Sequence, residues 1–418
     1  MLVTRADLLA QVDEVAGELT DLARIITIDS APVARLGGRP VIAWDELAAQ
    51  GGVAPERPAP STADIASLLF TSGTTGPSKG VLVRWGQITV GSELSPLATF
   101  GDDAATYSPY PVYHLSGKIP LVAMARVRGR VVTVEKYSTT RLWDDIAAYR
   151  CTSLGLIGAL AQFVTSVELR PDQIGHLRYV TMSPCLPTVD EIAARLQVAV
   201  GTAYGSTEAG WPLLNRCATA ADHLSCGRLR EGYELRIVDE RDRDVAVGQV
   251  GELLVRSTVP QLMSAGYFEL PDKTAEAWRG GWFHTGDAFR RDDEGRYYFL
   301  DRTKDAIRRR GENISSFEVE TYVEQHPQIE RCAAIAVPAE VGEDEVKVCV
   351  VPVAGATLDP SSLRGWLEAR MPRFMVPRYV EVVDDLPLTD TGKVKKAELR
   401  AVGVNATTFD ADRRAAPA

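Results

Sequence analysis

Residues 68–80 read LLFTSGTTGPSKG, an apolar run that ends in a loop of glycine, serine and threonine with one lysine. Glycines let backbone N–H groups approach an anion closely, hydroxyl groups add donors, and Lys79 adds positive charge. The loop therefore suits a polyphosphate, although loops of this composition are often only flexible connections. Its residue order differs from GxxxxGK[ST], because Lys79 precedes Gly80 rather than a serine or threonine, so a P-loop nucleotide triphosphatase is disfavoured.

The size and charge of the chain narrow the function further. With 418 residues, it is longer than one ordinary core, so we expect at least two domains. Its 46 Lys and Arg against 56 Asp and Glu give a formal charge of -10, which argues against a nucleic-acid partner. No apolar run is long enough to span a bilayer, and the first residues lack a secretory signal pattern. We therefore expect no membrane association and a cytoplasmic location.

The cysteine spacing gives no sign of a metal centre. Six cysteines are scattered along the chain without a CxxC pair or a histidine cluster at zinc spacing. In a reducing cytosol such residues are usually free, buried thiols. We expect that here, and we predict no structural metal.

Hydrophobic patterning predicts an α/β fold for the first part of the chain, because short β-branched runs alternate there with helical stretches. The strand-like runs are residues 25–28, 130–134, 178–181 and 198–201, and the helical stretches are 139–149 and 190–196. From Tyr233 the pattern becomes strand-rich, with glycine and aspartate turns. We therefore predict a large α/β domain with layered sheets plus a β-rich subdomain.

A compact α+β segment is predicted after Arg302. Ser315 and Glu318 form a possible capping box ahead of a helix that Pro327 ends. Strands are expected at residues 332–337, 346–351 and 379–383. Together these patterns predict a large domain at 1–302, a hinge at 303–305, a small mobile α+β domain at 306–405 and a disordered tail at 406–418.

Five further polar motifs follow the glycine-rich loop. They are YGSTE at 204–208, GWFHTGD at 281–287, DRTKD at 301–305, RRRGENI at 308–314 and PLTDTGKVKK at 387–396. Taken singly, each has a plainer interpretation as a turn, a surface ion pair or a solvated basic run. Their order and spread along the chain are therefore the stronger signal.

In residue type and order, the loop and these motifs resemble the adenylate-forming superfamily of acyl-CoA synthetases, adenylation domains of nonribosomal peptide synthetases, and luciferases. The matches run from Leu68 to Lys396, and residues 136–143 and 311–313 are most similar to medium-chain fatty-acid and carnitine or crotonobetaine CoA ligases. The resemblance implies ATP-dependent activation of a carboxylic acid to its acyl-AMP with release of pyrophosphate, then thioester formation. It also implies ATP, magnesium and coenzyme A as cofactors.

The resemblance assigns a role to residues in each motif. For the nucleotide, it implies adenine contacts from Tyr204 and Gly205, a ribose contact from Asp287, a further contact from Arg302, and phosphate contacts from Thr71, Ser72, Gly73, Thr74, Thr75, Gly76, Lys79 and Thr207. It implies that Glu208 binds magnesium and that Lys393 is catalytic. It places His114 at the acid site and Gly311 at the pantetheine tunnel. Two of these assignments, Glu208 as the magnesium ligand and Lys393 as the catalytic residue, agree with the chemistry of the side chains. A hard carboxylate suits magnesium, and a mobile ammonium group can stabilise charge that builds on the α-phosphate.

The acid site is less well specified. Its walls by analogy are residues 156–159, 181–187 and 209–211, which carry few charges and favour a hydrophobic or aromatic acyl chain over a polyanion. Two departures from the family pattern bear on this site: Trp85 stands where many relatives have histidine, and Ser183 begins a segment that is usually Gly-Gly-Ala. A small carboxylic acid is the expected substrate.

Two other functions stay open. An acyl-AMP ligase could load a carrier-protein phosphopantetheine or an amine instead of coenzyme A. The stretch before the phosphate loop is also shorter than in most relatives, which allows a truncated, weakly active nucleotide-binding or scaffolding subunit. Sheet edges exposed by that shortening make a homodimer a further expectation.

Overall fold

The structure is a computed structural model, and it describes residues 1–52, 56, 58–71, 78–93, 100–134, 138–157, 169–183, 185–259, 261–309, 312–339, 343–389 and 393–412. For residues 93, 157, 312 and 313 the description covers the backbone only. The chain falls into two compact units, Met1–Ala59 and Pro60–Ala418, and each is described by itself.

The first unit is a small α/β unit. Its sheet has the order β1-β2-β4-β3, with β1 parallel to β2, β2 parallel to β4, and β3 antiparallel to β4. The elements are β1 (Leu2–Thr4), α1 (Leu9–Glu14), β2 (Ile25–Thr27), β3 (Arg35–Leu36), β4 (Arg39–Ala43) and α2 (Trp44–Ala49). Leu9, Ile25 and Val41 form its buried core. The sequence predicted the strand at 25–28 but not that these residues form a unit of their own.

The second unit contains a sheet of eleven strands among its described residues, in the order β14-β15-β16-β17-β13-β12-β11-β10-β9-β7-β8. The strands are β7 (Ala105–Ser108), β8 (Arg130–Thr133), β9 (Ser153–Ile157), β10 (Tyr179–Ser183), β11 (Ala199–Ser206), β12 (Gly210–Asn215), β13 (Ser225–Leu229), β14 (Tyr233–Val238), β15 (Gly251–Ser257), β16 (Phe283–Arg291) and β17 (Arg296–Arg302). Strands β7 to β11 pair in parallel, and β11 to β17 pair antiparallel. The predicted α/β layers and β-rich subdomain therefore share one continuous sheet.

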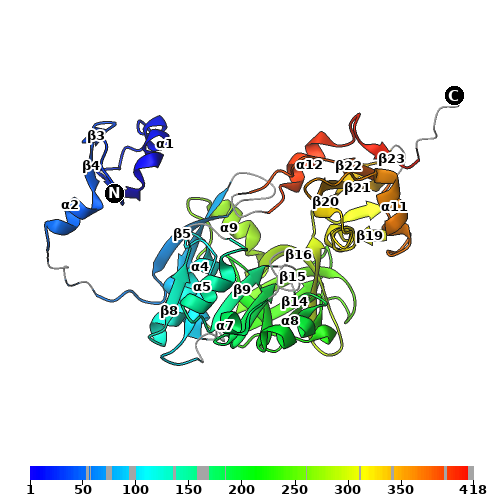
Figure 1. The fold of residues 1–418 in the computed structure, drawn as a ribbon, viewed down its shortest axis with the longest axis horizontal. Coiled ribbons are helices and arrows are strands. Elements are labelled where there is room, and N and C mark those ends of the chain that lie inside the picture. Colours follow the sequence, from blue (N-terminus) through cyan, green and yellow to red (C-terminus); the bar gives the residue numbers. More distant parts are fainter. Residues whose placement is uncertain are drawn as a thin grey trace. The chain divides into compact units, whose positions relative to one another are not determined.

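Helices cover the parallel half of this sheet (Figure 1). They include α5 (Leu142–Ala148), α7 (Pro171–Ile174) and α8 (Val189–Leu196). Trp143 and Ile146 of α5 and Ile192 of α8 are buried against Leu154 and Val180 of the strands. Because parallel strands are covered on their faces, they consist of the near-continuous apolar runs that the sequence showed.

A separate hairpin carries the glycine-rich loop. Strands β5 (Ile65–Thr71) and β6 (Lys79–Arg84) are antiparallel, with Thr71 opposite Lys79. Next along the chain come α3 (Trp85–Glu93) and α4 (Leu115–Arg126), while α9 (Pro271–Ala277) follows β15. Buried Val81, Ile88 and Ile119 pack the hairpin, α3 and α4 into one cluster.

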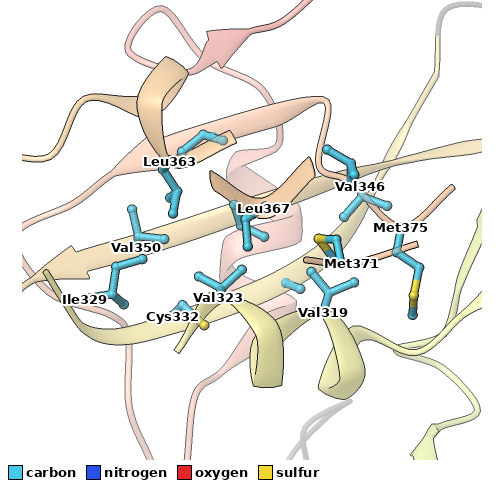
Figure 2. Close-up of a cluster of buried hydrophobic side chains, with 14 of the residues drawn as sticks. Val319, Val323, Ile329, Cys332, Val346, Val350, Leu363, Leu367, Met371 and Met375 are labelled. Carbon is cyan, nitrogen blue, oxygen red and sulfur yellow. The ribbon is translucent and has the colours of Figure 1, made fainter. Parts of the chain in front are cut away.

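The C-terminal part forms a small α+β domain around its own core. Its sheet has the order β20-β21-β22-β23, and its elements are β18 (Ile307–Arg309), β19 (Glu312–Ile314), α10 (Ser316–Val323), β20 (Ile329–Pro338), β21 (Asp344–Pro352), α11 (Pro360–Glu368), β22 (Tyr379–Val382), α12 (Lys396–Val402) and β23 (Phe409–Asp410). Figure 2 shows Val319 and Val323 of α10, Leu363 and Leu367 of α11, and Val350 of β21 in one buried cluster. The predicted fold class is confirmed.

The predicted helix start in this domain is also confirmed. Ser315 is the N-cap of α10, and its hydroxyl oxygen accepts a hydrogen bond of 3.0 Å from the backbone N–H of Glu318. Such a cap satisfies one N–H group that lacks a partner within the helix.

The C-terminal tail differs from the prediction. We expected residues 406–418 to be disordered, but Phe409 and Asp410 form β23, which pairs antiparallel with β22. Arg378 holds this strand, since its Nε and Nη2 atoms lie 2.9 and 3.0 Å from the two carboxylate oxygens of Asp410. The polar composition of the tail gave no sign of this bidentate ion pair. Residues 413–418 lie outside the described part.

The cysteines are free thiols, as predicted, and most of them are buried. The buried ones are Cys151, Cys185, Cys332 and Cys349. Burial raises the pKa of the Cys185 thiol to about 11, so it stays protonated at neutral pH. Separately, within the described ranges, every helix is too short or too polar to cross a bilayer.

Candidate functional site

Asp287 is the buried centre of the first half of the site. It lies on β16 directly opposite Arg302 on β17, and the Arg302 Nε atom is 2.9 Å from its Oδ1 atom. The hydroxyl group of Tyr204, at the end of β11, donates a hydrogen bond to the other oxygen, Oδ2. Burial raises the pKa of Asp287, while the charge of Arg302 and the hydrogen bond from Tyr204 lower it. Three predicted nucleotide residues are therefore brought together.

The ring of Tyr204 is fixed by aromatic packing. Its centroid lies 4.8 Å from that of Phe289, edge-on, and 6.5 Å from that of Phe299. Burial, and then the negative charge of Asp287, raise the pKa of the Tyr204 hydroxyl well above its ordinary value. The hydroxyl is therefore a neutral donor, and the ring has one orientation.

Glu208 is the centre of the second half. The hydroxyl group of Tyr267 donates a hydrogen bond of 3.1 Å to its Oε1 atom. The Nζ atom of Lys79 lies 4.8 Å from the centroid of the same tyrosine ring. Tyr267 also forms an isolated β-bridge with Val81 of β6, in the hairpin that carries the glycine-rich loop. One tyrosine therefore contacts both the predicted magnesium ligand and the lysine of the glycine-rich loop.

Sequence reasoning missed Tyr267. It follows Gly266, whose backbone φ is +108°, and its own backbone N–H is bonded to Thr274 Oγ1 at 2.9 Å. A Cβ atom at position 266 would lie 2.5 Å from the Thr274 side chain, so only glycine fits there. The stretch GYFELP at 266–271 was the one available signal, since an aromatic residue follows a glycine at a turn.

The turn that carries Glu208 is held from several sides. The Nε2 atom of Gln87, on α3, donates to the backbone oxygen of Thr207 at 2.6 Å. The backbone N–H of Ser264 donates to the backbone oxygen of Glu208 at 2.9 Å. A Cβ atom on Gly205 would lie 2.1 Å from the backbone oxygen of Gly210, so this turn also requires glycine.

Lys393 belongs to the small domain, yet its charge acts on the same site. It interacts electrostatically with Arg302, Asp287 and Glu208. Surrounding protein, and then Arg302, lower the pKa of Lys393, while the two carboxylates raise it. The side chain of Lys393 is exposed. Its backbone N–H donates to Thr389 Oγ1 at 3.1 Å, which shapes the turn before it.

His114 is described by its position at the start of a helix and by its contact with Tyr113. It is the N-cap residue of α4, and its ring centroid is 4.6 Å from that of Tyr113. Its proposed place in the acid site stays a prediction.

Part of the predicted phosphate contact surface is not described. Thr71 and Lys79 flank the loop, and the Thr71 hydroxyl donates to the backbone oxygen of Lys79 at 3.4 Å. Ser72, Gly73, Thr74, Thr75 and Gly76 lie outside the described residues, as does Gly311.

The described residues fit a magnesium nucleotide. Lys79, Arg302 and Lys393 supply positive charge, and Glu208 supplies the hard oxygen that magnesium prefers. The Tyr267 hydroxyl uses one lone pair of that carboxylate, which leaves its other oxygen for a metal.

Comparison with known proteins supports this interpretation. Residues 1–268 match the family model described as AMP-binding enzyme, and residues 318–393 match the AMP-binding enzyme C-terminal domain. The chain is 31% identical over 349 residues to a crotonobetaine/carnitine–CoA ligase of Citrobacter koseri, covering 81% of this chain and 67% of the relative. It is 33% identical over 347 residues to the ligase of that name from Proteus sp. strain LE138, with the same coverage.

The fold is also similar to solved structures. ATP-bound MatB from Rhodopseudomonas palustris superposes with a TM-score of 0.80 at 26% identity, over 96% of this chain and 78% of MatB. The predicted resemblance is confirmed, and the chain belongs to the family of AMP-binding enzymes, as an acid–thiol ligase that forms AMP.

Proposed function

We propose that Tyr204, Glu208, Asp287, Arg302 and Lys393 are the residues with which this chain converts a carboxylic acid and ATP into acyl-AMP, before coenzyme A takes the acyl group. The observation that carries the proposal is the convergence of Asp287, Glu208 and Arg302 from the large sheet with Lys393 from the small domain. Two carboxylates and two cations in one site suit a reaction that joins two anions.

The nucleotide half of the site would bind ribose and adenine. A carboxylate offers about four lone-pair positions: the Tyr204 hydroxyl occupies one on Oδ2 of Asp287, and the Arg302 guanidinium lies against Oδ1 as an ion pair and covers one there. The remaining two can accept hydrogen bonds from the two ribose hydroxyls. The fixed ring of Tyr204 supplies an aromatic face for adenine.

The phosphate half would neutralise charge. Glu208 and the ammonium group of Lys79 face the triphosphate in this proposal, with Tyr267 between them. Magnesium bound at Glu208 would screen the negative charge that repels the attacking carboxylate.

Lys393 would act in the first chemical step. An oxygen of the substrate carboxylate attacks the α-phosphorus, a new P–O bond forms, and the bond to the β-phosphate breaks as pyrophosphate leaves. Negative charge builds on the α-phosphate oxygens in this step, and an exposed ammonium on a turn can meet it.

The second step would form the thioester. The thiolate sulfur of coenzyme A attacks the acyl carbon, and the C–O bond to AMP breaks. The roles of the hinge at 303–305, of Gly311 and of His114 in this step are predictions, as are the domain boundaries.

The identity of the acid is also part of the proposal. The relatives named above act on crotonobetaine or carnitine, and the few charges in the predicted walls favour a small hydrophobic acid. Transfer to a carrier protein, a homodimeric state and a cytoplasmic location stay predictions.

The test is acid-dependent exchange of labelled pyrophosphate into ATP, followed by mass analysis of the product with coenzyme A present. We expect exchange that requires magnesium and an acid, and a thioester product. Exchange without thioester formation would favour the carrier-protein or amine ligase. Absence of exchange with every acid of a broad panel would remove the enzymatic proposal and favour the scaffolding subunit.

A further inference from the structure

The carboxylate of Asp287 is presented by an irregular stretch of β16. Between the strand pairs that His284 and Ala288 of β16 form with β15, β15 has one residue and β16 has residues 285–287. These residues, here called the Asp287 bulge, leave the regular ladder, and Asp287 is the last of them. A bulge of this kind re-aims a side chain and often lies beside a functional site. The direction of the Asp287 carboxylate therefore depends on what holds the bulge in place.

Glu252 of β15 holds the Asp287 bulge from the neighbouring strand. Its Oε1 atom accepts a hydrogen bond of 3.0 Å from the backbone N–H of Gly286. Its Oε2 atom lies 3.0 Å from Nδ1 of His284 and 3.5 Å from Nη2 of Arg279. Both oxygens of the carboxylate are in use, so the Glu252 side chain is held in one orientation.

Thr285 holds the bulge from within. Its hydroxyl group donates to the backbone oxygen of Leu253 at 2.7 Å, and the hydroxyl oxygen accepts from the backbone N–H of Asp287 at 3.1 Å. On the other side, the backbone N–H of Thr303 donates to the backbone oxygen of Gly286 at 2.9 Å. These bonds replace the ladder bonds that the bulge gives up, and buried main-chain groups need such partners.

Gly286 shows that this arrangement demands a special backbone conformation. Its φ is +69°, which residues with a side chain rarely adopt. A Cβ atom at this position would meet no other atom within 4 Å. The glycine is therefore required by its conformation rather than by lack of space, and the hydrogen bond to Glu252 holds that conformation.

The side chain at the end of the bulge has an unused acceptor position. Asp287 is only 3% exposed, and the Tyr204 hydroxyl donates to its Oδ2 atom. Its Oδ1 atom forms an ion pair with Arg302 but receives no hydrogen bond from the described residues. A buried acceptor without a donor is unfavourable, so a ligand hydroxyl that supplies one gains affinity. The bulge sets where that hydroxyl must lie.

We propose that Glu252 and Thr285 are positioning residues, which fix the bulge so that Asp287 receives the ribose hydroxyls of ATP, and that the preference for ribonucleotides over deoxyribonucleotides depends on them. This inference rests on the proposed function, because it takes Asp287 as the ribose ligand. Neither residue acts on the nucleotide directly, since each acts through the backbone of the bulge. Glu252 lies outside the GWFHTGD motif at 281–287, and only the pairing of β15 with β16 brings it there.

The experiment measures kcat/KM for ATP, 2′-deoxy-ATP and 3′-deoxy-ATP in pyrophosphate exchange, together with the KM of the acid. Glu252→Ala removes the acceptor for Gly286, Glu252→Gln keeps an acceptor oxygen, and Thr285→Val removes the hydroxyl at nearly the same volume. Glu234→Ala is the matched control, because this carboxylate on the neighbouring strand β14 accepts from Arg256 Nε at 2.7 Å and not from the bulge. Calorimetric titration of the three nucleotides without acid gives a second readout that needs no turnover.

We expect wild type to prefer ATP over each deoxy analogue by about tenfold or more, since hydrogen bonds to a charged group are strong. Glu252→Ala and Thr285→Val should lose most of that preference while the KM of the acid stays unchanged, because only the placement of the ribose carboxylate is altered. Glu252→Gln should keep part of the preference, and Glu234→Ala should keep all of it.

A wild-type preference for ATP in folded Glu252→Ala or Thr285→Val would overturn the inference. So would an equal loss with all three nucleotides accompanied by a higher KM for the acid, since that is the result of a merely structural role. Thr285→Val decides the matter where Glu252→Ala fails to fold. A wild type that uses the three nucleotides equally would overturn this inference together with the ribose role of Asp287, whereas no exchange with any acid overturns the proposed function itself.

Discussion

Asp287 and Arg302 face each other across β16 and β17, and the 2.9 Å contact between Oδ1 and Nε is the main compensation for a carboxylate that is only 3% exposed. In Arg302→Gln, Asp287 would lose the largest of the effects that lower its pKa and keep the hydrogen bond from Tyr204 and the charge of Lys393, so its pKa should rise further.

A carboxylate with a raised pKa loses its charge at a higher pH as the solution is acidified. We therefore expect the acidic limb of the pH profile for pyrophosphate exchange to move upward in Arg302→Gln, and the KM for ATP to rise about tenfold. Arg290→Gln, on the same strand as Asp287 and stacked on Tyr298, is the control. An unmoved acidic limb would show that Asp287 does not titrate in this range.

Tyr267→Phe tests the link between Lys79 and Glu208. The ring stays in place for Lys79, but the hydroxyl that orients the Glu208 carboxylate is removed. We expect the magnesium concentration for half-maximal exchange to rise about tenfold, as for other groups that orient a metal ligand.

The matched control is Tyr233→Phe, because the hydroxyl of Tyr233 donates to the backbone oxygen of Leu262 and not to a site residue. If both variants show the wild-type dependence on magnesium, Glu208 does not need Tyr267 for its orientation.

Lys393→Ala separates the two half-reactions. Without the ammonium group, formation of acyl-AMP should fall by about 10²- to 10³-fold, whereas conversion of supplied acyl-AMP to thioester should continue. Single-turnover assays of each half-reaction measure this. Lys395→Ala is the control, since Lys395 is exposed and pairs with Glu398 at 3.1 Å. Equal loss of both steps would speak against a lysine that serves only the first.

Asp292 gives a prediction for stability. Burial raises its pKa, but hydrogen bonds from Arg296 and Tyr298 outweigh this and bring the pKa to about 2. A carboxyl whose pKa is lowered on folding stabilises the protein above its unfolded pKa, and this stabilisation is lost as the pH falls toward the folded value. Asp292→Asn should therefore lower the free energy of unfolding by about 1 kcal/mol at pH 7, after allowance for its partial exposure.

Urea denaturation of both proteins should show the difference shrinking as the pH falls from 5 toward the folded pKa of about 2. A difference that does not change with pH would mean that the lost contact is steric rather than electrostatic.

Local patterns predicted most of the fold because strands and helices carry their own periodicity. Residues 190–196 became α8, and residues 234–238 became β14. The single sheet across both halves was not predictable, because the pairing of β13 with β17 depends on contacts between segments that lie far apart in the sequence. The same reason hid β23, which is only two residues long.

For the site, motif order predicted Asp287, Arg302 and Glu208. In the structure Asp287 contacts Arg302 and Tyr204, and Glu208 accepts a hydrogen bond from Tyr267. Tyr267 and Gln87 escaped prediction, because each acts through a partner 59 or more residues away. No local spacing records such relationships.

The short strand β23 restrains the segment that carries Lys393. Residues 383–408 leave the sheet at β22 and return to it beside β22 at β23, so both ends of the segment that carries the lysine are fastened to one sheet. The bidentate contact between Arg378 and Asp410 holds β23 beside β22. Because β22 and β23 fix both flanks of this segment to the sheet of the small domain, we predict that a large displacement of Lys393 is a displacement of the small domain itself.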